Sequence, residues 1–79
     1  MRPMRHPNEH RKLGLKIAFC RRQRDWTQEN LADSLDIGQQ QISRIERGVA
    51  GVSLDRIVDI ANSLGVEPSH LLDFEDMIE

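Results

Sequence analysis

The sequence predicts an all-α fold, a compact five-helix bundle, and three observations support this. Apolar residues recur at helical spacing, and no stretch alternates apolar and polar residues for long enough to form a convincing strand. Residues that begin or end helices separate the periodic segments. The 79 residues, 38% of them hydrophobic, suffice for one domain with one modest core. We expect residues 1–8 to form a flexible basic arm and residues 9–79 a single domain.

The first two helices are predicted from apolar periodicity and from one capping residue. The first should run from about Asn8 to Arg24. Thr27 stands at the N-cap of the second, Gln28 to Leu35, since its hydroxyl can accept a free backbone amide. The positions expected on the inner faces of these helices are Leu13, Ile17, Cys20, Arg24, Leu31, Ala32 and Leu35.

The last two helices are predicted from caps and glycines. Ser53 should cap the fourth helix, which Gly65 stops. Pro68 suits the first turn of a short fifth helix. The core stripe expected on the fourth helix consists of Leu54, Ile57, Ile60, Ala61 and Leu64.

The third helix has an unusual polar face. Asp36-Ile37-Gly38 should form a tight turn, with Ile37 as its apolar plug, into a helix from Gln39 to Arg47 that Gly48 ends. On a helical wheel Ile42 and Ile45 face the core. The opposite face has amides, a hydroxyl and guanidiniums but no carboxylate, and Gln41 lies at its flank. This face consists of Gln39, Gln40, Ser43, Arg44 and Arg47.

That combination of side chains suits the major groove of DNA. A glutamine amide can bond adenine N6 and N7 together, and arginine can donate two bonds to guanine. An ordinary solvated helix face is the alternative interpretation. Two short helices joined by a three-residue turn favour a helix-turn-helix, which presents its second helix in this way.

The stretch TQENLADSLDIGQQQISRIERG resembles the helix-turn-helix of the phage repressor/Cro (XRE-like) family. The Thr-Gln opening, the Leu-Ala pair, the apolar turn residue and the final glycine match at the expected spacing. The family's lambda-repressor-like pattern of five helices covers roughly residues 9 to 72. Small controller proteins and prophage repressors are similar in size.

The resemblance implies a role for each matching residue. Gln39, Gln40 and Arg44 match positions that read base edges. Arg21 and Glu46 match an ion pair that ties the first helix to the recognition helix. The positions implied to contact the backbone or flanking bases are Gln28, Gly38, Gln41, Ser43 and Arg47.

Two departures from the family pattern affect phosphate contact. Gly38 stands where a Ser or Thr cap is common, although glycine is an acceptable cap. The loop after the recognition helix often carries Lys or Arg, but here it is Val49-Ala50-Gly51. Phosphate contact should therefore depend more on Arg47, Gln28 and the basic arm.

The charges are unevenly distributed. Residues 1–24 carry eight basic residues and one acidic, residues 25–48 two and five, and residues 49–79 one and seven. The basic N-terminal end can therefore bind an anion, although a basic tail on an acidic domain gives the same charge pattern. Arg2 and Arg5 resemble an arm in the minor groove, and a disordered start is the alternative.

Other classes of protein are disfavoured. No run of 18 apolar residues is present and no apolar signal region follows the basic start, so we expect a cytoplasmic protein without a membrane span. Cys20 permits no internal disulfide and His6 with His10 has no third ligand, so no metal is expected. No catalytic set is evident, so we expect no enzyme and no cofactor. Trp26 is better explained by packing than by base stacking.

The sequence thus predicts a homodimeric regulator that binds a palindromic operator in double-stranded DNA. The dimerisation segment is expected at the chain end, in Leu71, Leu72, Phe74, Met77 and Ile78. The rival prediction is a protein-interaction module such as an antitoxin. In that prediction the acidic chain end, with Leu15 and Phe19, binds a toxin or another protein. The alternative for Leu15 and Phe19 is that the chain end folds back and covers them.

Overall fold

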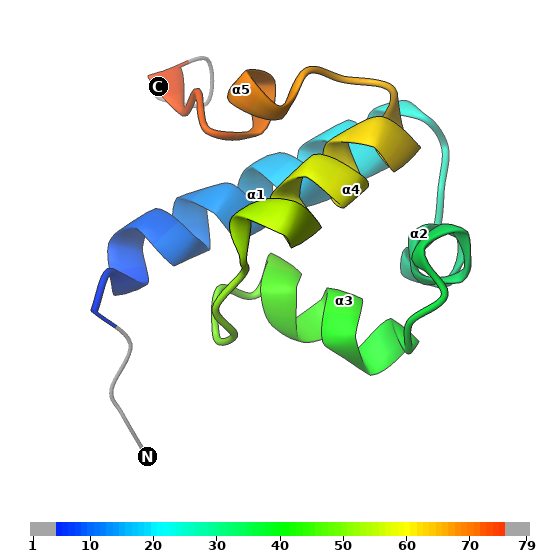
Figure 1. Cartoon of the computed structure of the whole chain (residues 1–79), viewed down its shortest axis with the longest axis horizontal. Coiled ribbons are helices and arrows are strands. Elements are labelled where there is room, and N and C mark those ends of the chain that lie inside the picture. The colour runs from blue at the N-terminus through cyan, green and yellow to red at the C-terminus, as the bar shows by residue number, and fades with distance from the viewer. Residues whose placement is uncertain (1–4, 76–79) are drawn as a thin grey trace.

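The fold is an all-helical bundle, as the apolar periodicity predicts. The computed structural model describes residues 5–75. Within this range the chain forms five helices and no strand: α1 (Pro7–Gln23), α2 (Gln28–Leu35), α3 (Gln39–Glu46), α4 (Leu54–Leu64) and α5 (Pro68–Leu71) (Figure 1).

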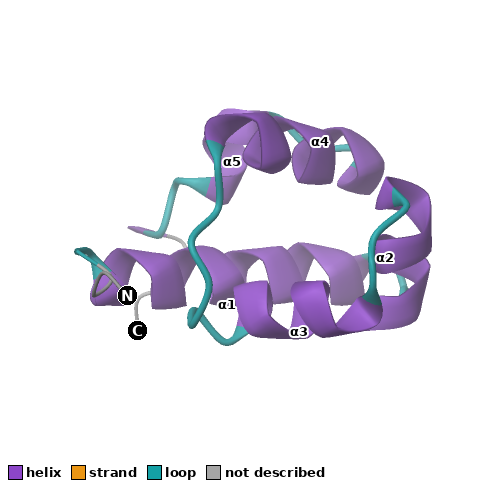
Figure 2. Ribbon diagram, turned by 60° about the horizontal axis from the view of Figure 1, so that its bottom comes forward, coloured by secondary structure: helices purple, strands orange, loops and turns teal. Residues whose placement is uncertain are grey.

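The core lies between α1 and α3 on one side and α4 and α5 on the other, with α2 closing one end (Figure 2). Each helix turns its apolar face inward, and partly buried Leu35, Ile37 and Trp26 pack against the core edge. The buried core consists of Leu13, Ile17, Cys20, Leu31, Ala32, Ile42, Ile45, Ile57, Ile60, Ala61, Leu64 and Leu71.

Local capping sets the starts of α2 and α4 where the sequence predicts them, and a glycine follows the end of α3. The Thr27 hydroxyl accepts from the Asn30 amide at 3.0 Å, and the Asn30 side chain accepts from the Thr27 amide at 2.9 Å. Ser53 Oγ accepts from the Arg56 amide at 3.1 Å at the start of α4. Gly48, with φ 74°, takes the left-handed conformation just after α3. The Thr27 and Ser53 caps satisfy amides that a helix leaves unpaired at its start.

Gly14 allows α1 and α3 to approach each other closely. It is buried on α1, and a Cβ added there would lie 2.5 Å from the carbonyl oxygen of Ile45 and against that of Glu46. Only a residue without a side chain fits, because backbone atoms cannot move aside as a flexible side chain can. Gly14 therefore fixes the distance from α1 to the end of α3.

Several sequence predictions are corrected by the packing. α1 begins at Pro7, so residues 7 and 8 belong to the helix and not to the arm, and it ends at Gln23. Arg24 is exposed rather than facing the core, with its guanidinium 4.7 Å from the centre of the Trp26 ring. Lys16, which periodicity does not place in the core, is fully buried.

The two ends of the α4–α5 segment also differ from prediction. Leu54 is 68% exposed, because it is the first residue of α4 and no other element covers it. Leu71 is fully buried, because α5 packs on α4 and α1 and turns this side chain into the core. Leu54 is therefore not a core residue.

Candidate nucleic-acid interface

The α2–α3 unit is held by its turn and by the core beneath it. Asp36 ends α2 with φ 56°, and the amide of Ile37 donates to the Ala32 carbonyl at 3.0 Å. Ile37 packs against the core while Gly38 starts α3. The turn thus directs α3 across the end of α2, with one face of α3 on the core and the other free (Figure 1).

The outer face of α3 has the predicted composition. Ile42 and Ile45 are buried beneath it. The side chains that face outward are exposed Gln39, Gln40, Gln41, Arg44 and Arg47 and half-buried Ser43. Arg47 Nε donates to the Ser43 carbonyl at 3.4 Å. No described residue bonds the side chains of the three glutamines or of Arg44, so their donors and acceptors remain available.

Glu46, the carboxylate of α3, is turned inward and neutralised. Its side chain lies between Arg21 of α1 and Gln28 of α2, and the Arg21–Glu46 ion pair that the resemblance implies is present. Arg21 Nε donates to Glu46 Oε2 at 2.8 Å and Nη2 to Oε1 at 3.1 Å. The third guanidinium nitrogen, Nη1, donates to the Trp26 carbonyl at 2.7 Å. The pair joins α1 to α3 and removes negative charge from the outer face.

Gln28 has a second contact that the sequence did not predict. Its Nε2 donates to Glu46 Oε1 at 2.9 Å. An amide NH2 carries two donors, so one donor and the amide oxygen remain for another partner. Gln28 therefore links the ion pair to the start of α2, beside the free face of α3.

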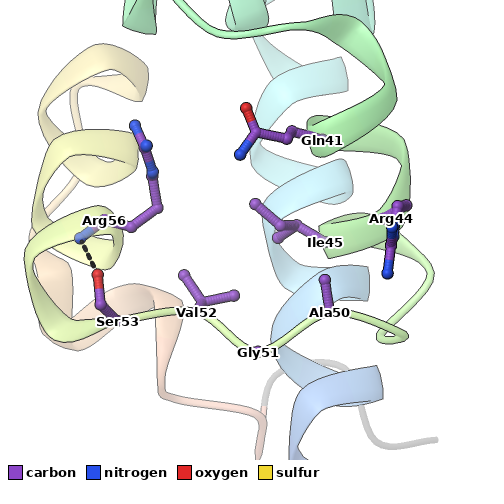
Figure 3. Close-up of a pocket in the computed structure, with 8 residues that line it drawn as sticks. All are labelled: Gln41, Arg44, Ile45, Ala50, Gly51, Val52, Ser53 and Arg56. Carbon is purple, nitrogen blue, oxygen red and sulfur yellow. Dashed lines mark hydrogen bonds between the residues drawn. The ribbon is translucent and has the colours of Figure 1, made fainter. Parts of the chain in front are cut away.

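A groove runs between α3 and the start of α4. It has a volume of about 380 Å³ and is lined by Gln41, Arg44, Ile45, Ala50, Gly51, Val52, Ser53 and Arg56 (Figure 3). Arg56 was not among the predicted site residues. Arg56 is the one basic residue in positions 49–79, so the sequence could have drawn attention to it. The sequence does not indicate, however, which side of α4 its side chain occupies.

The predicted dimerisation residues divide into three groups. Leu71 is fully buried within the monomer and cannot form an intersubunit contact, which corrects that prediction. Leu72 is 50% exposed, and Phe74 is half-buried against the core. Met77 and Ile78 lie outside the described residues.

Leu15 and Phe19 remain uncovered in the described part of the chain, with exposures of 59% and 44%. Phe74 packs on the core instead, so it does not cover them. Within residues 5–75, no three His, Cys, Asp or Glu side chains gather as metal ligands, and no helix has the length and hydropathy of a transmembrane segment.

The comparison with known families decides the classification. Residues 17–71 match the helix-turn-helix family HTH_3. The chain belongs to this family. HTH_3 chains are DNA-binding regulators of transcription rather than enzymes, which agrees with the outer face of α3.

Individual relatives of this HTH_3 chain include a control protein and a restriction-modification controller protein. It is 52% identical over 48 residues to control protein C.BamHI of Bacillus amyloliquefaciens, a stretch that covers 61% of this chain and 59% of that protein. The crystal structure of the restriction-modification controller C.AhdI from Aeromonas hydrophila has a TM-score of 0.80 at 29% identity, covering 86% of this chain and 99% of that one. The hypothetical transcription factor NHTF from Neisseria shares the fold, with a TM-score of 0.83 at 23% identity over 98% of this chain and 88% of that one.

Proposed function

We propose that this protein is a sequence-specific regulator that binds a near-palindromic operator as a homodimer, with α3 in the major groove. The observation that carries the proposal is the outer face of α3, where the glutamine amides and the Arg44 guanidinium are exposed without a described partner and the carboxylate is buried. A surface of donors without negative charge suits base edges between two phosphate chains.

Each exposed residue of α3 has a proposed role. Gln39, Gln40 and Arg44 read base edges, since they are exposed on one helix face with free donors. The neighbouring groups meet the DNA backbone or flanking bases. These are Gln28, Gly38, Gln41, Ser43 and Arg47.

The regulated genes are proposed from the relatives. One protein similar to this chain is named a control protein and another a restriction-modification controller protein. We propose the same role here, as an autoregulatory controller or repressor of the operon that encodes it. The chain needs no cofactor in this scheme, because hydrogen bonds alone select the operator.

Selection of binding sites from random DNA tests the proposal. Two copies of α3 on one face of the duplex should select near-palindromic sites, with half-site centres about 10 base pairs, or a multiple of that, apart. Single asymmetric half-sites bound by a monomer would contradict the dimer. Failure to enrich any sequence would contradict sequence-specific binding.

A second function is favoured by one observation, the uncovered pair Leu15 and Phe19 on α1, with basic Arg11 and Lys12 beside them. An apolar pair within a basic helix face suits an acidic protein partner. In that case the domain is an interaction module, such as an antitoxin, and DNA binding is secondary. Binding to DNA should weaken steeply with salt, whereas an apolar protein contact should not.

A further inference from the structure

We propose that Arg56, from α4, binds a phosphate of the DNA sugar–phosphate backbone in the groove between α3 and α4. The inference rests on the proposed function, because it places the operator against α3. Arg56 supplies a positive charge beside the loop Val49-Ala50-Gly51, which contains no basic residue.

Arg56 has no counter-ion in the described residues. Its side chain is half-buried, yet no described residue accepts a hydrogen bond from its guanidinium or forms an ion pair with it. Asp55 and Asp59 lie one and three positions away on the same helix, and neither is within ion-pair distance. A partly desolvated guanidinium gains most from an anionic acceptor, which is what a phosphate offers.

The lining of the groove also suits an anion. Besides Arg56 it contains the guanidinium of Arg44, the amide of Gln41 and the hydroxyl of Ser53, and it has no carboxylate. Arg56 and Gln41 extend into the groove from opposite sides, one from α4 and the other from α3 (Figure 3). Donors from two helices can therefore converge on one anion.

The shape and polarity of the groove favour DNA backbone over a free anion. The floor of the groove is apolar, formed by Ile45, Ala50 and Val52. A deoxyribose presents an apolar face next to its phosphate, whereas a free phosphate would leave this floor unused. The groove also adjoins the half of α3 that carries Arg44, so a helix lying in the major groove would bring one flanking strand to it.

The test compares Arg56→Gln with a matched control, Arg22→Gln. Both variants lose one positive charge, but Arg22 is exposed on α1, away from the groove. Affinity for the selected operator and for random DNA is measured over a range of salt. We expect Arg56→Gln to weaken both about tenfold and to reduce the salt slope by about one, while Arg22→Gln keeps nearly the wild-type slope. Arg56→Lys should restore most of the slope.

A second measurement locates the phosphate. Operator duplexes carry one neutral methylphosphonate at a time. At one backbone position per half-site, the substitution should weaken the wild-type protein but leave Arg56→Gln unaffected. Inorganic phosphate, added to the free protein, should give no saturable shift of the Arg56 guanidinium signal in NMR. A saturable shift at millimolar phosphate would instead assign the groove to a free anion.

The outcomes separate this inference from the proposed function. Sequence-specific binding with an unchanged salt slope in Arg56→Gln would overturn the role of Arg56 alone. Equal slope losses in Arg56→Gln and Arg22→Gln would also overturn it, because a general charge effect would explain both. Loss of slope in Arg56→Gln on DNA bound without sequence preference would support the phosphate contact and contradict the proposed function. No binding to DNA at all would contradict both.

Discussion

At the scale of single residues, Glu46 influences the outer face of α3 because its carboxylate is buried and not exposed on that face. The carboxylate accepts three hydrogen bonds, two from Arg21 and one from Gln28. A buried charge is tolerable only when it is paired and bonded in this way. The same contacts hold α3 against α1 and keep negative charge away from the bases that α3 is proposed to read.

Removing Glu46 should therefore reduce stability more than removing any exposed carboxylate. We expect Glu46→Ala to lower the free energy of unfolding by about 3 kcal/mol, because the Arg21 guanidinium is left buried without its anion. Asp33→Ala is the control, since Asp33 is exposed on α2, and it should change stability by less than about 0.5 kcal/mol. Urea denaturation measures both. Equal small losses would show that the ion pair contributes little.

Base reading and backbone anchoring should separate by mutation on α3. Gln40→Ala or Arg44→Ala should cost about 1–3 kcal/mol on the selected operator and relax the preference at defined positions. Arg47→Ala should weaken binding to all sequences by similar factors, because phosphates are the same everywhere. Competition binding on operator and random DNA measures the difference. If all three variants lose equal affinity on both, the assignment of roles is wrong.

At the scale of helices, the packing of α1 on α3 depends on a missing side chain. Gly14 is buried where a methyl group would meet the backbone of Ile45 and Glu46. Glycine in a helix is unfavourable by about 1 kcal/mol relative to alanine. The close contact that it permits brings the end of α3, with the ion pair, against α1. Helix propensity and tertiary packing therefore act in opposite directions at this position.

Two glycine variants test which effect is larger. Gly14→Ala should destabilise the fold by about 1–3 kcal/mol, in spite of the better helix propensity of alanine, because α1 must move away from backbone atoms. Gly38→Ser is the control: nothing lies within 4 Å of an added Cβ, and serine can cap α3. It should be neutral or stabilise by a few tenths of a kcal/mol. A stable Gly14→Ala protein would contradict the close packing.

At the scale of the whole molecule, the chain end contributes residues to the core of the monomer and to the proposed dimer interface. Two consecutive leucines differ in burial: Leu71 is fully buried in the core, and Leu72 is half exposed and available for the proposed dimer interface. Phe74 packs against the core and, together with Leu13, Ile57 and Leu72, lines a depression beside the start of α1. A truncation at residue 74 would remove core contacts together with the proposed dimer contacts, so single substitutions are the sharper test.

The leucine pair should therefore respond in opposite ways. Leu72→Ser should shift the protein toward monomer and weaken operator binding, with thermal stability of the monomer nearly unchanged. Leu71→Ala should reduce stability by about 2–5 kcal/mol through the cavity it leaves. Sedimentation velocity and thermal denaturation measure the two effects. If Leu72→Ser remains a full dimer, the interface lies elsewhere, and Leu15 with Phe19 becomes the leading candidate.

The sequence by itself determined the helices, their caps and the outer face of α3. These features depend on neighbours within a few residues: Thr27 with Asn30, Ser53 with the Arg56 amide, and a wheel on which Ile42 and Ile45 share one side. The Arg21–Glu46 pair was implied by resemblance to a family and not by spacing, because its members lie 25 positions apart.

Only the tertiary structure decided which positions are covered. Periodicity shows which residues share a helix face but not where the covering neighbour ends, so Leu54 is exposed and Leu71 is buried. The need for glycine at position 14 arises from the carbonyl groups of α3. The direction of Arg56 depends on how α4 packs beside α3 (Figure 3). Each of these outcomes depends on contacts between residues that are far apart in the chain, and the pattern of neighbouring residues in the sequence does not specify such contacts.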